Sequence, residues 1–186
     1  MTCIVGLAEN NTVYMGADSG SGSSGDWDMR ISAVPKLFRS GPFLIGYTSS
    51  WRMGQILQHH LHMEELVLPV SGSDVQEFMV CTFIEKVREA LKTFAYATKE
   101  HNEETGGQFL VGCFGHLFHI ESDYQVNEAA DGMDACGCAE KFALGALWSS
   151  RAEKPRERIA KALDAAAYFS GGVRPPMIIE SVDDER

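Results

Sequence analysis

The sequence begins with a residue pair that could supply a nucleophile. Met1 is followed by Thr2, so removal of Met1 would leave a threonine with a free α-amine. A threonine hydroxyl is a weak nucleophile, and an N-terminal amine acting as the base is a recognised way to activate it. The start of the chain therefore favours nucleophilic attack on an acyl group.

A hairpin would bring a carboxylate to this threonine. The apolar runs 3–7 and 12–17 are joined by the polar turn 9–11, a pattern typical of a β-hairpin. Asp18 directly follows the second run, and pairing of the two strands places it near the first residues. We therefore expect Thr2 and Asp18 to share one site.

Turn residues and hydrophobic spacing predict the other elements that must position this site. After a Gly/Ser loop that begins the segment 19–35, the predicted strands are 36–39, 43–47, 108–114, 116–121, 134–136 and 177–179. The predicted helices are 51–63, a long one from Ser73 or Asp74 to about Lys99, one that ends at Leu147, and 153–169.

This order predicts one α+β domain that spans residues 1–186. Hairpins, two helices, hairpins, two helices and a strand favour a four-layer αββα sandwich, with two antiparallel sheets between helix layers. The length suits a single domain, and the sequence contains no internal repeat.

Composition excludes several classes of function. The net charge of −10 argues against nucleic acid or an anionic membrane as a partner. No apolar run approaches the roughly 20 residues that span a bilayer, and the N-terminus lacks the pattern of a signal peptide. The five cysteines show no disulfide spacing, which favours reduced thiols in a cytoplasm. No Gly-x-x-x-x-Gly-Lys-Ser/Thr motif for ATP occurs.

The first eighteen residues resemble the start of proteasome β-subunits and of the bacterial peptidase HslV. That family opens on threonine and places an aspartate at the end of the second strand, as Thr2 and Asp18 do here. A lysine, an apolar-basic strand, a turn and an apolar strand ending in Gly-aromatic-small-small follow in the family and in residues 36–49. The register is also similar from Ala135 to Leu147 and at Ser170-Gly171-Gly172.

The resemblance implies the N-terminal nucleophile hydrolase fold and a role for each matching residue. Thr2 would be the nucleophile, Lys36 the catalytic lysine and Asp18 its partner. The backbone N–H of Ser49, where the family usually has glycine, would receive the oxyanion at the start of the next helix. By position, Tyr47 and Trp51 are candidates for the wall of the substrate pocket.

Two positions depart from the family pattern. Cys138 stands where the family has a serine that hydrogen-bonds near the threonine amine, and a thiol is the poorer hydrogen-bonding group. Ala167 stands where the family has an aspartate three residues before Ser170. Cys138 and Ser170 remain candidate catalytic-site residues in this comparison.

The implied function is that of a threonine peptidase that needs no cofactor or metal. It would be an endopeptidase subunit of a homo-oligomeric double ring that hydrolyses unfolded polypeptides, fed by a separate AAA+ ATPase. Two alternatives stay open: a catalytically inactive ring or interaction protein of the same fold, and a small-molecule amidase. A metal site at His59-His60-x-His62 is disfavoured because no carboxylate or thiol completes it, and the Cys136/Cys138 pair is only a weak metal or redox signal.

Overall fold

The computed structural model describes residues 1–22, 28–63, 66–69 and 74–185. The strands are β1 Cys3–Glu9, β2 Thr12–Ala17, β3 Gly20–Gly22, β4 Met29–Ile31, β5 Leu37–Ser40, β6 Phe43–Tyr47, β7 Thr98–Glu100, β8 Glu103–Thr105, β9 Phe109–Cys113, β10 His116–Ile120, β11 Val126–Glu128, β12 Met133–Gly137 and β13 Ile178–Asp183. The helices are α1 Trp51–His59, α2 Val75–Phe78, α3 Ile84–Thr93, α4 Glu140–Ser149 and α5 Pro155–Phe169, and a π-helical segment, Met79–Phe83, joins α2 to α3.

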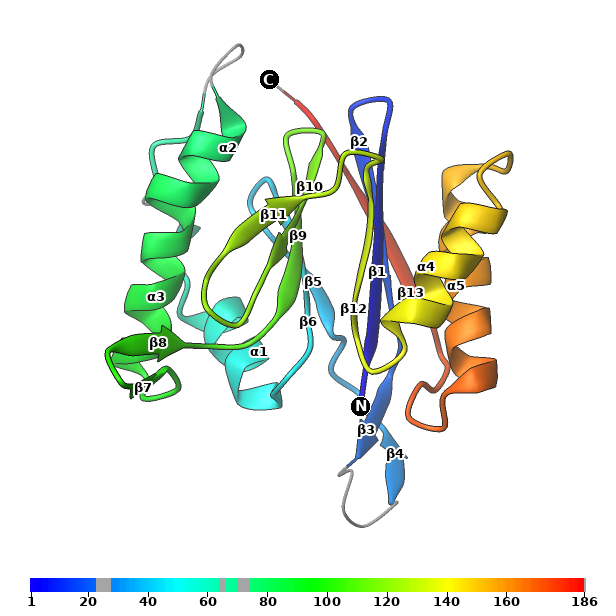
Figure 1. Cartoon of the computed structure of the whole chain (residues 1–186), viewed down its shortest axis with the longest axis horizontal. Helices are drawn as coiled ribbons and strands as arrows, with labels where there is room; N and C mark the ends of the chain where they lie inside the picture. The colour runs from blue at the N-terminus through cyan, green and yellow to red at the C-terminus, as the bar shows by residue number, and fades with distance from the viewer. Residues whose placement is uncertain (23–27, 64–65, 70–73, 186) are drawn as a thin grey trace.

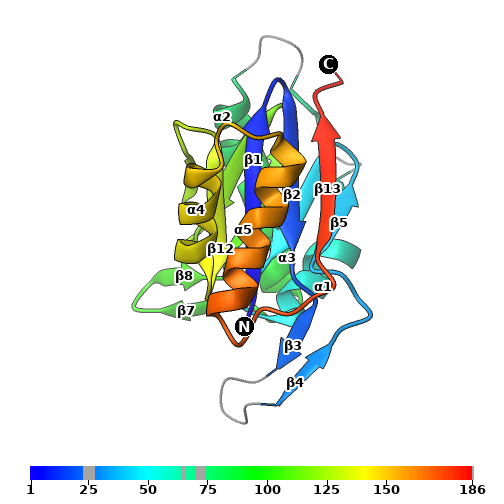
Figure 2. The same ribbon diagram turned by 90° about the vertical axis from the view of Figure 1, so that its right-hand side faces the viewer.

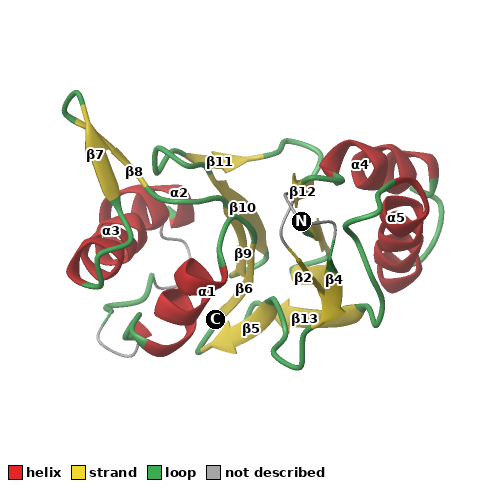
Figure 3. Ribbon diagram, turned by 90° about the horizontal axis from the view of Figure 1, so that it is seen from below, coloured by secondary structure: helices red, strands yellow, loops and turns green. Residues whose placement is uncertain are grey.

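Two antiparallel sheets stack between two helix layers, which confirms the predicted α+β sandwich (Figure 1, Figure 3). One sheet has the order β12-β1-β2-β13, and the other has the order β11-β10-β9-β6-β5. Helices α4 and α5 cover the outer face of the first sheet, as Figure 2 shows. Helices α1 to α3 cover the outer face of the second.

The apolar core divides into three layers because strand side chains alternate between faces. In β1, Ile4 points between the two sheets, whereas Cys3, Val5 and Leu7 point toward α4 and α5. A third cluster fills the space between the second sheet and α1 to α3. Both sheets are therefore covered by apolar side chains on both faces.

The three predicted hairpins are confirmed as β1–β2, β5–β6 and β9–β10. The first turns through Asn10 and Asn11, both with positive φ, and the third through Phe114 and Gly115. Two-residue turns of this kind match the natural twist of the strands. The first hairpin therefore returns β2 to the start of the chain, where Asp18 follows.

The prediction of one helix to about Lys99 was wrong at its C-terminal end. The helix begins after the N-cap Asp74 and ends at Thr93, because Ala95 takes a left-handed φ of 55° and the next N–H groups turn back onto Leu91. Residues 98–105 instead form the hairpin β7–β8. The helix predicted over 51–63 likewise ends early, at His59. The loop predicted to begin the segment 19–35 was wrong in part, because this segment contains the paired strands β3 and β4, while its residues 23–27 lie outside the described part of the chain.

Gly54→Ala tests how firmly α1 holds the Tyr47 ring. A Cβ at residue 54 would lie 2.1 Å from that ring, whereas a Cβ at Gly145 in α4 would meet nothing within 4 Å. We expect Gly54→Ala to lower the free energy of unfolding by about 1–3 kcal/mol, the usual cost of overpacking. The control Gly145→Ala should raise it by up to about 1 kcal/mol through helix propensity. Urea denaturation measures both, and an unchanged midpoint for Gly54→Ala would show that the ring is free to move.

Candidate active site

A buried carboxylate lies at the centre of the site. Asp18 is 1% exposed and follows β2. Its Oδ1 accepts hydrogen bonds from the Cys3 N–H at 3.0 Å and from Lys36 Nζ at 2.8 Å. Its Oδ2 accepts from the N–H groups of Gly20 at 2.8 Å and Arg174 at 3.2 Å. A buried charge is tolerated when it is paired and hydrogen-bonded in this way.

Lys36 is held by that carboxylate and reaches the first residue of the chain. It is 3% exposed and precedes β5. Burial lowers the pKa of Lys36, and the charge and hydrogen bond of Asp18 oppose this effect. Lys36 Nζ also lies 3.3 Å from the carbonyl oxygen of Met1, to which it donates. The ion pair therefore aims a cation at the start of β1.

Thr2 and Lys36 converge on one carbonyl oxygen. The Thr2 hydroxyl donates to the Met1 oxygen at 2.7 Å, and Lys36 Nζ donates to the same atom. The structure thus brings Thr2, Asp18 and Lys36 together, although they lie on three different segments. The hairpin supplies the first two, and the β5–β6 hairpin of the second sheet supplies the lysine.

Cys138 and Ser170 lie beside the backbone of Thr2. The Cys138 thiol is 3.4 Å from the Thr2 carbonyl oxygen and 3.7 Å from Ser170 Oγ. The preceding Gly137 has a φ of 104°, and a Cβ there would lie 2.3 Å from the Thr2 oxygen. Only glycine lets β12 pass this close to the backbone of Thr2.

Ser49 occupies a strained turn between β6 and α1. Its φ is 59°, a left-handed conformation that costs a residue other than glycine about 1–2 kcal/mol. The turn is closed by a 2.6 Å hydrogen bond from the Ser50 N–H to the Thr48 oxygen. The Ser49 hydroxyl accepts from the Gln108 N–H at 3.0 Å. This side-chain contact offsets part of the backbone strain at Ser49. The family that the sequence resembles usually has glycine at this position, which adopts the left-handed conformation without strain.

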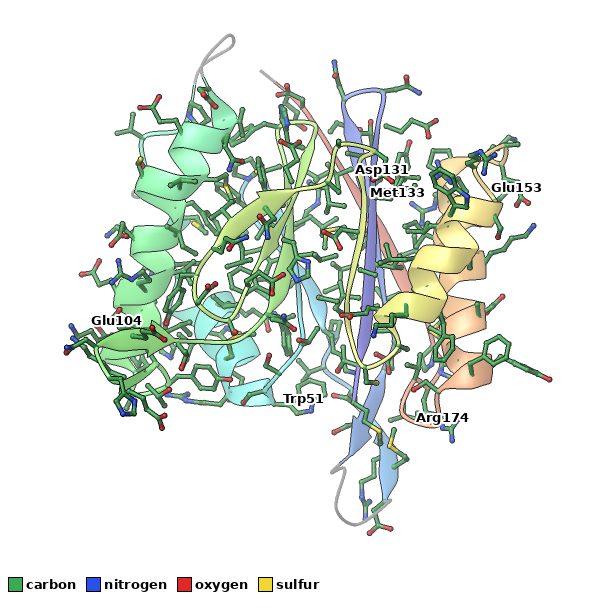
Figure 4. The ribbon with its side chains drawn as sticks, viewed as in Figure 1. Trp51, Glu104, Asp131, Met133, Glu153 and Arg174 are labelled. Carbon is green, nitrogen blue, oxygen red and sulfur yellow. The ribbon has the colours of Figure 1, made fainter. Side chains whose placement is uncertain are left out.

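A small cavity of about 80 Å³ adjoins Thr2. Tyr47 and Trp51 both line it, with Met1, Thr2, Gly22 and residues 48–50. The Tyr47 ring is 3% exposed and makes an edge contact with Trp51 at a centroid distance of 5.9 Å. Burial raises the pKa of Tyr47 to about 12, so its phenol stays neutral. Trp51 and Arg174 lie at the end of the molecule that carries the N-terminus (Figure 4).

Sequence reasoning missed the three backbone donors to Asp18, the N–H groups of Cys3, Gly20 and Arg174. The Gly20 contact is an Asx-type bond to the residue two positions ahead, so the Asp-Ser-Gly run was a usable signal. The Arg174 contact spans 156 residues and uses a backbone N–H, which carries no residue-type signature. Ala167 is partly buried and packs with the core beneath α5.

The histidines of the 59–62 segment show no metal arrangement. The His60 ring stacks on Phe94 at a centroid distance of 3.9 Å. Within the described ranges of the chain, no group of three or more His, Cys, Asp or Glu side chains is placed to hold a metal ion.

Of the helices in the described part of the chain, none is both long and apolar enough to cross a membrane.

Comparison with known proteins places the fold. No protein-family model and no curated protein matches the sequence. Among solved structures, BPH of Thiobacillus denitrificans in complex with epoxomicin is similar with a TM-score of 0.78 and 18% identity, over 100% of both chains.

Two further solved structures give the same result. HslV of Trypanosoma brucei has a TM-score of 0.68 and 19% identity, over 98% of this chain and 99% of its own. Anbu, an ancestral β-subunit, of Yersinia bercovieri has a TM-score of 0.69 and 16% identity, over 98% and 82%. The chain therefore has the fold of these BPH, HslV and Anbu structures, as its sequence motifs predicted.

Proposed function

We propose that residues 1–186 form one threonine endopeptidase domain that becomes active when Met1 is removed. The observation that carries this proposal is the buried Asp18–Lys36 ion pair, whose ammonium group meets the Thr2 hydroxyl at a shared carbonyl oxygen. The shared oxygen belongs to Met1 and leaves with it, but it shows that the ammonium group lies close enough to Thr2 to polarise the hydroxyl for acyl transfer.

The proposed reaction proceeds through an acyl-enzyme. Thr2 Oγ attacks the carbonyl carbon of the substrate, and the Thr2 amine takes the hydroxyl proton directly or through water. The amine then returns the proton to the leaving nitrogen of the cleaved peptide bond. Water attacks the ester that remains, with the amine again as base, and releases Thr2.

Lys36 and Asp18 act on this amine by electrostatics. The charge of Lys36 favours the neutral, basic form of the Thr2 amine through like-charge repulsion, and it polarises the hydroxyl. Asp18 keeps Lys36 charged and in place, since its four donors leave the carboxylate no freedom to turn. Both groups position and tune Thr2 and transfer no proton themselves.

The remaining site residues stabilise and select. The Ser49 N–H is the proposed oxyanion donor, a contribution worth about 3–4 kcal/mol in other enzymes. Tyr47 and Trp51 form the proposed wall beside the scissile bond, which the cavity next to Thr2 supports. Cys138 supports the Thr2 backbone by its contact with the Thr2 oxygen, and Ser170 contacts the Cys138 thiol.

We further propose a homo-oligomeric double ring that receives unfolded polypeptides from a separate AAA+ ATPase in the cytoplasm. The fold similarity to HslV and Anbu supports the ring. The net charge of −10 is unfavourable for nucleic acid and for anionic membranes.

Two alternatives share the fold. An inactive ring protein is favoured by Cys138 and Ala167, which replace polar groups of the family pattern, and it requires Met1 to remain. A small-molecule amidase is the third candidate, and a monomeric or dimeric protein would favour it over a ring.

Intact mass spectrometry tests whether the nucleophile is freed. We expect the natively expressed protein to lack one methionine, because Thr2 is small enough to follow a removable initiator. Epoxomicin, which the similar Thiobacillus protein binds, should then add its mass to the same species. Thr2→Ala should abolish the adduct. Complete retention of Met1 would favour the inactive ring protein.

Lys36→Ala tests the proposed role of the ion pair. We expect turnover of a fluorogenic peptide to fall at least ~10²-fold, because an interaction aimed at developing charge is lost, while the assembly on size-exclusion chromatography is unchanged. Lys161→Ala is the matched control, since this exposed lysine pairs with Glu153 on the surface and should leave the rate unaltered. Full activity of Lys36→Ala would contradict the proposal.

A further inference from the structure

A series of polar side chains, Gln108, Glu121, His119 and Asp134, crosses the apolar space between the two sheets. Its central residue is His119 of β10, which is 8% exposed. Leu110 pairs with His119 in the sheet, and Leu110 and Leu117 both belong to the cluster between the sheets. His119 therefore points from the second sheet toward the first.

His119 stands between two carboxylates. Its Nδ1 lies within hydrogen-bond reach of Asp134 Oδ2 on β12, at 3.3 Å, whereas its buried Nε2 makes no hydrogen bond and lies 3.8 Å from Glu121 Oε1, just after β10, at ion-pair distance. Burial lowers the pKa of His119, but the hydrogen bond to Asp134 and the charges of Asp134, Glu121 and Glu140 outweigh it, so the net shift is upward from 6.5. The surroundings favour the imidazolium.

One end of this series of polar side chains reaches the turn that carries Ser49. The side chain of Gln108 donates to Glu121 Oε2 at 2.6 Å, and its backbone N–H donates to Ser49 Oγ at 3.0 Å. The Thr48 N–H and hydroxyl both donate to the Gln108 oxygen at 3.1 Å. Glu121 is thus tied to the strained turn through a single residue.

The other end reaches the strand beside Thr2. Asp134 Oδ1 accepts from the Ala135 N–H at 2.7 Å, in the same strand that continues to Gly137. Cys138 follows and contacts the Thr2 oxygen at 3.4 Å. The series of polar side chains therefore connects the turn of Ser49, the proposed oxyanion donor, with β12, which leads to Cys138 beside the proposed nucleophile Thr2.

We infer that His119 is a positioning residue of the proposed active site, whose imidazolium bridges Glu121 and Asp134 and so fixes the Ser49 turn relative to the strand that supports Thr2. This inference rests on the proposed function. A neutral imidazole keeps one N–H for Asp134 but loses the positive charge that attracts Glu121. The bridge, which closes a gap between two independently packed sheets, is then broken.

The pH dependence follows from the direction of the shift. Because the folded state raises the pKa of His119, its stabilising contribution is full below about pH 6.5 and is lost as pH rises through the folded pKa. The kcat should therefore carry an alkaline limb that begins above pH 6.5, while KM changes little. The opposite trend, a bridge that strengthens as pH rises, would require a lowered pKa.

The test compares kcat and KM profiles from pH 5.5 to 9 for the intact oligomer. His119→Gln should lower kcat ~10- to 100-fold at pH 6, the range expected when a catalytic group moves by up to about 1 Å, and should lack the alkaline limb. Asp134→Asn should move the limb to lower pH. The control is His116→Gln, since His116 lies on the same strand as His119 but has a side chain that is 42% exposed and pairs at 2.7 Å with Glu128 of β11. It should match the wild type.

Hydrogen exchange read by mass spectrometry separates this inference from the proposed function. At pH 6, the wild type should protect segments 46–50 and 134–138 better than His119→Gln, and the two should converge at pH 9. If no peptide is cleaved at any pH, the proposed function fails. The difference in hydrogen exchange then decides by itself whether His119 connects the Ser49 turn to β12. Equal exchange of the two proteins at pH 6, or an alkaline limb retained in His119→Gln, would overturn the inference.

Discussion

The structure depends on one buried carboxylate. Asp18 ties together the first strand through Cys3, the second sheet through Lys36 and the segment after α5 through Arg174. Removing such a charge from water costs several kcal/mol, so it is stable only with all its donors in place. Because the buried carboxylate must keep all four donors, the segments that carry them are fixed around Thr2.

Close approach of backbone to backbone is the second constraint. Gly137 passes the Thr2 carbonyl where no Cβ fits, and Gly46 faces Ile4 across the sheets, where a Cβ would lie 2.6 Å from its methyl group. Ser49 shows the alternative to glycine, because its hydroxyl accepts a hydrogen bond that offsets a left-handed φ. Local backbone strain near Thr2 is thus balanced by contacts from neighbouring segments.

A series of polar side chains centred on His119 crosses the apolar cluster between the sheets. Ile4, Leu110 and Leu117 pack there without directional preference. The contacts of His119 are directional and change with protonation. A charged bridge in an apolar layer therefore adds a specific register between sheets that hydrophobic packing alone would not impose.

The sequence by itself determined the hairpins, the four-layer order and the position of Asp18 beside the start of the first strand, because turn residues and alternation act over short separations. The position of Lys36 was accessible through its motif. Only the tertiary structure decided that the Arg174 N–H completes the carboxylate and that His119 meets Asp134. It also decided where the helix predicted to Lys99 ends, at Thr93. Such contacts join segments whose separation in the chain carries no local signal, and they form only when the two sheets and their helices pack together.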